Sequence, residues 1–199
     1  MAEPRKPLRR GSSTLDAADE PAFEVGRDQM RGVPTSESRI RLSRVVDSLN
    51  ANLYGNVHGG AIMRLVDEAA GVVASRHSGG RAVTAVVDEL QFVVPVHVGD
   101  IVTCDAQVNW TGRTSCEIGV RVTAQPWNKG GDSGRHVASA YLVFVAIDDL
   151  EHPRVIPPVM PENDDDRRRF REAEIRRGTR LARREAIMRS REREQLNPS

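Results

Sequence analysis

Residues 58–77 read HGGAIMRLVDEAAGVVASRH and predict the one long helix of the domain. It opens on a glycine pair, and its apolar residues cover most of the circumference of a helix. A helix that is apolar nearly all round is buried on most sides, so the rest of the domain must be built around it. A single carboxylate, Asp67, lies in the middle, in a stripe of small residues (Gly60, Gly71 and Ala74) that would let another backbone approach closely.

The residues on either side of this helix have the period of half-buried strands. Alternating or β-rich runs occur at residues 39–43, 81–94, 102–110, 115–124 and 137–147, and the last is apolar on both faces. The links at residues 95–100 and 111–113 are short and resemble hairpin connections. Short links predict antiparallel neighbours, because parallel strands need a long crossover. We therefore expect an α+β fold, in which one antiparallel sheet of about five strands curls around one long central helix.

The polar positions of the strands predict which residues lie on the outer face of the sheet. This face carries Asp105, Gln107, Glu117 and Arg121.

Composition divides the 199 residues into three parts. Residues 1–36 are rich in Pro, Gly, Ser and charge without a sustained period, which predicts a disordered or loosely attached N-terminal extension. Residues 37–150 carry nearly all the aliphatic and aromatic side chains and form the folded domain. Residues 151–199 are a charged, arginine-rich tail, in which acidic residues precede twelve arginines. That order complements a helix dipole and predicts a partly helical surface segment.

Several classes of protein are excluded by composition. No run approaches the ~18 apolar residues of a membrane helix, and the N-terminus does not have the pattern of a secretory signal. The two cysteines, Cys104 and Cys116, have neither a disulfide nor a metal-site pattern and fall on apolar strand faces, so we expect both in the core and the chain in the cytoplasm. A net charge of +1 argues against a protein whose whole surface is built to bind nucleic acid.

Asp67 is the first candidate for chemistry. A carboxylate inside a buried helix costs several kcal/mol unless it is paired, protonated or in a wet site. One interpretation is a structural acid that accepts hydrogen bonds from nearby backbone. The other is a general base or nucleophile in a pocket. The neighbouring Glu68 is less unusual, because Arg64 lies four residues earlier and can pair with it.

Two glycine-containing segments are the next candidates. Between Asn56 and Gly60, unshielded N–H groups at a helix start can stabilise negative charge on an oxygen, and the Asn56 amide both donates and accepts hydrogen bonds. The alternative is a tight turn with a helix N-cap. Between Gly112 and Ser115, an arginine and hydroxyls can hold a phosphate, or the segment is a plain turn. The scattered histidines His77, His97, His136 and His152 are expected at the surface.

These residues occur in an order that resembles the hotdog-fold cytosolic acyl-CoA thioesterases, a group that includes the brain-type acyl-CoA hydrolase and its bacterial relatives. The resemblance covers residues 37–150 and extends into the tail at residues 159–170. Its pieces are Asn56-Val57-His58-Gly59-Gly60, Leu65-Val66-Asp67-Glu68-Ala69-Ala70, Arg76-His77, Val83-Thr84, Phe92 with Pro95, Val98-Gly99-Asp100 and Gly112-Arg113-Thr114-Ser115.

The resemblance implies hydrolysis of fatty acyl-CoA to free fatty acid and CoA, without a metal or cofactor. It implies that two hotdog domains pair into one continuous sheet, that the dimers commonly assemble into trimers of dimers, and that the active site lies between paired domains. One domain supplies a loop asparagine and the other a helix aspartate, which by position are Asn56 and Asp67. Asp67 would activate a water molecule or attack the thioester, and Asn56 would orient the reactants.

The resemblance also places the substrate. The segment His58, Gly59 and Gly60 is expected to bind substrate and stabilise the oxyanion through its N–H groups. Contacts to CoA are expected from Thr84, Arg113, Thr114 and Ser115.

Two other functions fit the same fold. A non-catalytic acyl-CoA-binding sensor would use the tail to contact nucleic acid or a partner, but Asn56 and Asp67 are both present. The tail's twelve arginines against nine acidic residues between positions 162 and 194 also leave little net charge. A dehydratase or hydratase would need a histidine or an Asp/His pair, and the helix offers Asp67 alone. The expected function is therefore acyl-CoA hydrolysis.

Overall fold

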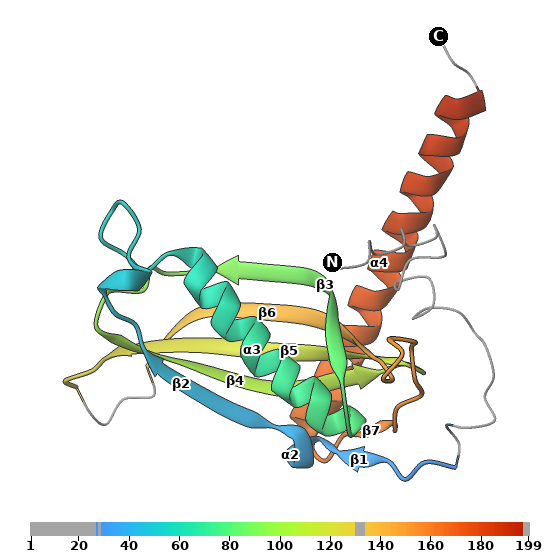
Figure 1. The fold of residues 1–199 in the computed structure, drawn as a ribbon, viewed down its shortest axis with the longest axis horizontal. Helices are drawn as coiled ribbons and strands as arrows, with labels where there is room; N and C mark the ends of the chain where they lie inside the picture. Colours follow the sequence, from blue (N-terminus) through green and yellow to red (C-terminus); the bar gives the residue numbers. More distant parts are fainter. Residues whose placement is uncertain (1–26, 28, 130–133, 197–199) are drawn as a thin grey trace, which may run out of the picture.

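The computed structural model describes residue 27, residues 29–129 and residues 134–196 (Figure 1). Most of the expected N-terminal extension, residues 1–26 and 28, lies outside the described residues. The first elements are strand β1 (Val33–Pro34) and helix α2 (Thr35–Ser38), so regular structure begins slightly before residue 37. β1 pairs in parallel with β7 (Val159–Met160), which ties the start of the folded domain to the segment that precedes the tail.

The central helix is confirmed as α3 (Gly59–Ser78), within one residue of the prediction. His58 caps its start, because the imidazole Nδ1 accepts the N–H of Gly60 at 3.0 Å. Gly79 ends it in the left-handed conformation at φ 69°, where a glycine avoids a steric penalty. The buried face consists of Ile62, Leu65, Val66, Ala69, Ala70, Val73 and Ala74.

Five antiparallel strands curl around α3, which confirms the α+β architecture (Figure 1). They are β2 (Ile40–Val45), β3 (Ala82–Phe92), β4 (Asp100–Thr111), β5 (Ser115–Pro126) and β6 (Arg135–Ala146). Their order across the sheet is β2-β4-β5-β6-β3. A 3₁₀ turn at Ser48–Asn50 lies in the loop between β2 and α3.

The prediction of a hairpin-like link at residues 95–100 is wrong. β3 is an edge strand beside β6, whereas β4 lies between β2 and β5. About 14 Å, or three strand spacings, separates β3 from β4, and residues 93–99 can cross it because an extended residue spans about 3.3 Å. This crossing passes the start of α3, where the N–H of Val57 donates to the carbonyl of Val96 at 2.9 Å. The link therefore places the loop before α3 against the end of the sheet.

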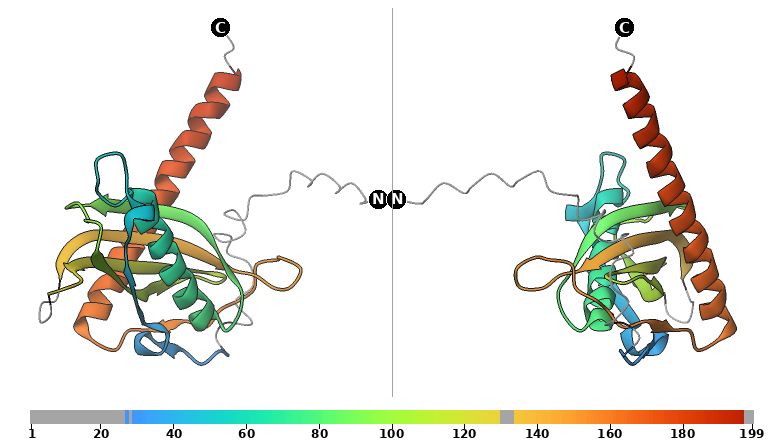
Figure 2. Two further views of the ribbon diagram at one scale, coloured as in Figure 1. Left: turned by 60° about the vertical axis from the view of Figure 1, so that its left-hand side comes forward. Right: turned by 90° about the vertical axis from the view of Figure 1, so that its right-hand side faces the viewer.

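The outer face of the sheet is covered in part by helix α4 (Asp164–Leu196), on the side opposite α3 (Figure 2). Gln107 and Glu117 lie on the outer face, as predicted, but both are buried under α4. Arg176 of α4 donates to Glu117 Oε1 at 2.7 Å and its guanidinium lies 3.6 Å from the centre of the Tyr141 ring. An outward polar residue on a strand can therefore serve as a docking point for a charged helix rather than as a solvated surface.

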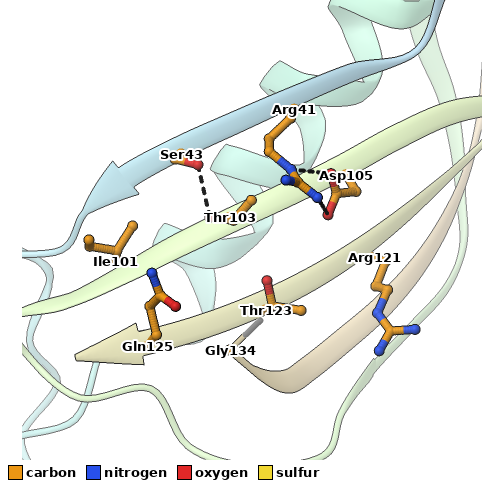
Figure 3. Close-up of a pocket in the computed structure, with 9 residues that line it drawn as sticks. All are labelled: Arg41, Ser43, Ile101, Thr103, Asp105, Arg121, Thr123, Gln125 and Gly134. Carbon is orange, nitrogen blue, oxygen red and sulfur yellow. Dashed lines mark hydrogen bonds and ion pairs between the residues drawn. The ribbon is translucent and has the colours of Figure 1, made fainter. Parts of the chain in front are cut away.

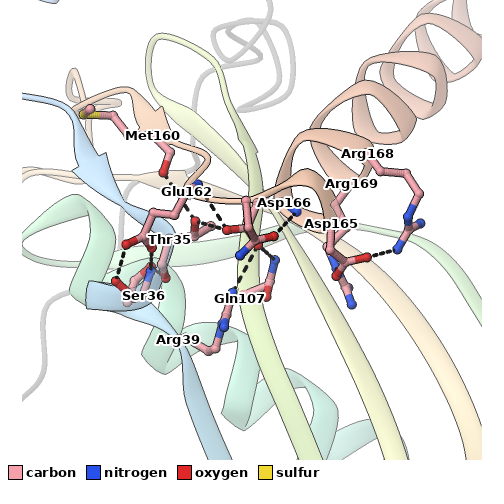
Figure 4. Close-up of polar contacts among 12 residues, drawn as sticks. Thr35, Ser36, Arg39, Gln107, Met160, Glu162, Asp165, Asp166, Arg168 and Arg169 are labelled. Atoms are coloured by element: carbon pink, nitrogen blue, oxygen red, sulfur yellow. Dashed lines mark hydrogen bonds and ion pairs between the residues drawn. The ribbon is translucent and has the colours of Figure 1, made fainter.

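The start of α4 is fixed by one buried carboxylate (Figure 4). Asp166 accepts hydrogen bonds from Thr35 Oγ1 at 2.7 Å, from Gln107 Nε2 at 3.1 Å and from Arg39 Nη2 at 3.1 Å. The backbone N–H of Glu162 adds a fourth at 3.2 Å. The cluster joins α2, β4 and α4, so the helical tail is docked onto the domain at its first turn.

This cluster predicts a pH-dependent stability. Burial raises the pKa of Asp166, but the hydrogen bonds from Thr35, Glu162 and Gln107 and the charge of Arg39 together hold that pKa below its ordinary value. A carboxyl whose folded-state pKa is depressed stabilises the fold above its unfolded-state pKa, and this stabilisation is lost as the pH falls through the folded-state pKa. The free energy of unfolding in urea should therefore fall below about pH 4.

Asp166→Asn should remove most of this acid-induced loss and lower the stability at pH 7 by about 1–3 kcal/mol, the range for unsatisfied buried polar groups. Asp164→Asn is the matched control, because Asp164 lies in the same turn and pairs with Arg167 at the exposed surface. Equal pH profiles for the Asp166→Asn chain and the unaltered chain would contradict this account of α4 docking.

Candidate active site

Asp67 lies on the open face of α3 and is exposed, so the prediction that it sits in a buried position is wrong. The sheet wraps the other sides of α3 and leaves this face uncovered. Thr84 Oγ1 of β3 donates to Asp67 Oδ1 at 2.6 Å. No other hydrogen bond reaches this carboxylate from the part of the chain that the structure describes. One carboxylate oxygen is therefore anchored, and the second is available to an incoming molecule.

An open groove of about 560 Å³ adjoins Asp67, between α3 and β3. Gly71 and Val72 line it on the helix side, and Phe144 of β6 lines it on the sheet side. Thr84, Phe144 and Cys116 are register partners across β3, β6 and β5, so the groove crosses one row of the sheet. The neighbouring Glu68 does pair with Arg64, at 2.8 Å, as the four-residue spacing predicts.

The loop before α3 carries two ordered asparagines. Nδ1 of His97 donates a hydrogen bond to Asn56 Oδ1 at 3.1 Å. Among the described residues, no acceptor is bonded to the amide nitrogen of Asn56. Asn52 Oδ1 accepts the backbone N–H groups of Tyr54 at 2.9 Å and of Asn56 at 3.2 Å. Because two backbone donors require an oxygen, this turn fixes the orientation of the Asn52 amide and leaves its nitrogen as a donor.

Two residues of this loop region were missed in the sequence. Asn52 has a recognisable signal, an asparagine three residues before Gly55, which is typical of a turn closed by the side chain. His97 is exposed, as predicted, but the prediction gave it no role, and nothing local in the sequence indicates that it meets Asn56. The antiparallel bridge between Asn56 and His97 arises from the crossing of residues 93–99.

The N–H groups at the start of α3 are not equivalent. The N–H of Gly60 is donated to the His58 cap, so it is occupied in this structure. The N–H of Gly59 has no acceptor within the described ranges, and the Phe92 ring lies 3.5 Å from where a Cβ of Gly59 would be. Of the predicted oxyanion donors, Gly59 is the one whose N–H is available.

Asp67 and the loop asparagines do not form one cluster within a single chain. Asp67 lies eight residues after Gly59, which corresponds to about 12 Å along the helix axis. Asn52 and Asn56 lie in the loop before the first residue of the helix, beyond the end that is about 12 Å from Asp67. A hydrogen-bonded arrangement of these groups needs about 2.7–3.2 Å between heavy atoms, so one chain holds the two halves of the predicted site apart.

The structure separates the four residues predicted to contact CoA. Thr84 lies beside Asp67, but Thr114 and Ser115 are buried, and the Thr114 hydroxyl has no hydrogen-bond partner among the described residues. The hairpin is covered by the following segment, in which the N–H of Ile156 donates to the carbonyl of Arg113 at 2.9 Å. The buried placement argues against direct CoA contacts by Thr114 and Ser115. Arg113, between Gly112 and Thr114, is only half-buried.

A second hollow, of about 460 Å³, lies on the part of the outer sheet face that α4 leaves uncovered (Figure 3). Its lining is polar, with an Arg41–Asp105 ion pair at 2.7 Å and a Ser43–Thr103 hydrogen bond at 2.8 Å. None of the predicted site residues lines it. Within the described residues, no three His, Cys, Asp or Glu side chains gather as metal ligands, and no helix is long and apolar enough to span a membrane.

Cys104, Cys116 and His77 are buried inside the domain and have structural rather than catalytic positions. Cys104 and Cys116 are buried, as predicted, and burial raises the pKa of each thiol to about 12, which leaves little of the nucleophilic thiolate. His77 is buried rather than at the surface as predicted, and its Nε2 donates to the carbonyl of Pro157 at 3.0 Å. Burial lowers the pKa of His77.

A five-stranded antiparallel sheet wrapped around one long helix, with a carboxylate on the open helix face, defines a hotdog-fold protein. A family model described as the thioesterase superfamily matches residues 54–129. The acyl-CoA hydrolase of Staphylococcus aureus, solved with butyryl coenzyme A and coenzyme A, superposes with a TM-score of 0.73 at 32% identity. That match covers 81% of this chain and 98% of the S. aureus chain. The chain therefore belongs to the thioesterase superfamily.

Two further relatives extend the comparison. The cytosolic acyl coenzyme A thioester hydrolase of Mus musculus is 35% identical over 141 residues, which are 71% of this chain and 37% of the mouse protein. This chain thus spans little more than a third of the length of that relative. A hexameric acyl-CoA thioesterase superposes with a TM-score of 0.73 at 30% identity, covering 77% of this chain and 97% of its own.

Three residues of the S. aureus enzyme have been replaced by alanine in solved structures: an asparagine, an aspartate and a threonine. In that enzyme the aspartate follows the asparagine by 15 positions, and the threonine follows the aspartate by 17.

Proposed function

We propose that this protein hydrolyses acyl-CoA thioesters to a carboxylic acid and CoA, in a site that two copies of the chain build together. The observation that carries the proposal is the Asp67 carboxylate, anchored by Thr84 and open to a groove. The similarity to acyl-CoA hydrolases over nearly the whole S. aureus chain supports the substrate class.

The open edge of β3 supplies the means of joining two copies. β3 pairs with β6 on one side only, and an unpaired edge strand is a template for another strand. Its exposed apolar side chains, together with the residue that follows it, are Val83, Val87, Phe92 and Val93. Antiparallel pairing of two β3 strands would give one continuous sheet and cover this edge.

The same pairing would complete the site. Thr84, near the start of β3, touches Asp67, whereas Phe92, at the end of β3, lies against Gly59 and the loop before α3. In an antiparallel pair, the start of one strand faces the end of the other. The loop of one copy, with its asparagines and the Gly59 N–H, would therefore come beside Asp67 of the other, and a two-fold dimer would hold two sites.

Asp67 would act as the general base. Its anchored oxygen keeps the carboxylate in one orientation, and the second oxygen takes a proton from water as the water attacks the thioester carbonyl. The carbonyl oxygen becomes negatively charged and is stabilised by the Gly59 N–H and a loop amide. The C–S bond then breaks, and the CoA thiolate leaves. Direct attack by Asp67 is the alternative, through a mixed anhydride that water hydrolyses.

The position of the asparagine can be refined. In this chain an asparagine, Asn52, lies 15 positions before Asp67, and a threonine, Thr84, lies 17 positions after it. These are the spacings of the three residues replaced in the S. aureus enzyme, counted without a gap. All three residue types agree, and Thr84 and Asp67 are in contact. We therefore propose Asn52 as the amide that orients the reactants, and Asn56, through its contact with His97, as support for the loop.

A matched pair of variants separates the two asparagines. Asn52→Ala should lower kcat for hydrolysis about 10²–10³-fold, as expected for loss of one donor at an oxyanion site. Asn56→Ala should have a smaller effect, since its amide oxygen is engaged by His97. A larger loss of kcat in Asn56→Ala than in Asn52→Ala would instead identify Asn56 as the amide that orients the reactants.

Release of free thiol from acyl-CoAs of increasing chain length tests the function as a whole. Turnover with any chain length supports hydrolysis and ranks the substrates. Binding of CoA esters without turnover would instead favour the acyl-CoA sensor. The name of the cytosolic mouse relative supports a cytoplasmic location for this chain, and the hexameric relative supports assembly of its dimers into trimers of dimers.

A further inference from the structure

Helix α4 crosses the outer face of the sheet strand by strand toward the β3 edge. Asp166 contacts Gln107 of β4, and Arg176 then contacts Glu117 of β5. Arg180 next donates to Asp88 of β3 at 2.8 Å, and both side chains of this pair are largely buried. The helix is thus anchored across the sheet and reaches its edge at Arg180.

The helix continues well past that edge. Sixteen residues follow Arg180, up to Leu196, which corresponds to about 24 Å of helix. β3 is the last strand of the sheet on this side, so within the described residues no strand lies beneath this part. Figures 1 and 2 show it projecting beyond the domain. We call residues 181–193 the distal segment.

The side of α4 that faces the sheet carries two exposed apolar side chains in the distal segment. At 3.6 residues per turn, Ile187 continues the row of Arg176 and Arg180. Met188 likewise continues the row of Arg177, whose guanidinium lies over the Trp110 ring at 5.1 Å. Ile187 is 46% exposed and Met188 is 48% exposed. A charged helix of this length is marginal in water without tertiary support, so this row indicates a surface that lies beneath it in the assembled protein.

We propose that the distal segment is a clasp, which packs on the outer sheet face of a second copy of this chain. The occupant is a second copy because the distal segment leaves the domain at the edge through which two sheets are proposed to join. A paired β3 strand would extend the sheet under Ile187 and Met188.

Charge at the junction supports this partner. A groove of about 250 Å³ lies between α4 and β3, lined in part by Ile175, Arg183 and Glu89. Glu89 has no ion pair within the described part of its own chain, and the distal segment would bring Arg191, together with the Arg189–Glu185 pair, to the corresponding junction of the second copy. Each copy would therefore offer carboxylates and arginines to the other.

The clasp rests on the proposed β3 pairing, and its test distinguishes the two. The full-length chain is diluted while its mass is followed by sedimentation, and backbone amide exchange is followed by mass spectrometry. We expect amides of the distal segment to be protected in the dimer and to exchange rapidly on dissociation, while amides of residues 166–180 stay protected in both states. The double variant Ile187→Glu/Met188→Glu should raise the dimer Kd about tenfold or more, because it places carboxylates in an apolar contact.

Ala182→Glu/Ala186→Glu is the matched control, since both alanines are exposed and lie on the side of the distal segment opposite Ile187 and Met188. It should leave the Kd within about twofold. A dimer whose distal amides exchange rapidly, or a Kd that the double variant does not change, would overturn the clasp and leave the β3 pairing intact. A chain that remains monomeric at every concentration would overturn the pairing itself, together with the clasp.

Discussion

Replacement of Asp67 by asparagine is expected to lower the rate of acyl-CoA hydrolysis roughly 10²–10⁴-fold, the range for loss of a general base. The asparagine side chain has nearly the same shape, and its oxygen can still accept the hydrogen bond that Thr84 Oγ1 donates at 2.6 Å. Its amide cannot take a proton from the attacking water. The loss should appear in kcat, measured as thiol release at saturating substrate, while the thermal midpoint and the mass of the assembly stay unchanged.

Glu68→Gln provides the control on the same turn of α3. Glu68 is exposed and pairs with Arg64 at 2.8 Å, so its loss should cost about 0.5 kcal/mol of stability or less and leave hydrolysis intact. Full activity in the Asp67→Asn chain, or equal losses in both variants, would contradict the assignment of Asp67 as the base. A single-turnover reaction in ¹⁸O-labelled water detects direct attack when water opens the anhydride at the Asp67 carbonyl carbon, because the ¹⁸O atom then stays in the Asp67 carboxylate.

The helix and strands of the domain could be predicted from local pattern, but their arrangement could not. α3 was predicted within one residue, because a glycine pair and a long apolar run mark its ends. The pairing of β3 with β6 rather than β4 was not predicted, since a seven-residue link can close a hairpin or cross the end of a curled sheet. Which of these forms depends on the curvature around α3, a property of the whole domain.

Burial of polar residues was the least predictable property. Asp67 was expected inside and is exposed, because an apolar helix shows how much of its surface is covered but not which side the curled sheet leaves open. Gln107 and Glu117 were expected on the outer face and are buried there, because their cover is a helix whose own sequence is arginine-rich. Asn52 was assigned no role in chemistry because its position before Gly55 is typical of a turn residue, and the sequence does not show that the turn leaves its amide nitrogen as a donor.

A site shared between two chains predicts that two inactive variants restore each other. The Asp67→Asn chain keeps Asn52, and the Asn52→Ala chain keeps Asp67. In a mixed dimer, one site combines Asp67 of one copy with Asn52 of the other and is intact, and the second site lacks both groups. With random pairing of equal amounts, an average of one site in four is intact, so activity should return to about a quarter of the unaltered level.

The measurement is thiol release after the two variant chains are co-expressed, with mixed dimers verified by mass. A mixture of the Asp67→Asn chain with a chain that carries both substitutions is the control, because none of its sites combines Asp67 with Asn52. Recovery in the first mixture alone requires the two groups to meet across chains, which agrees with the ~12 Å of helix that separates Asp67 from its own loop. Verified mixed dimers without recovery would place the complete site within one chain and would require α3 or the loop before it to move on substrate binding.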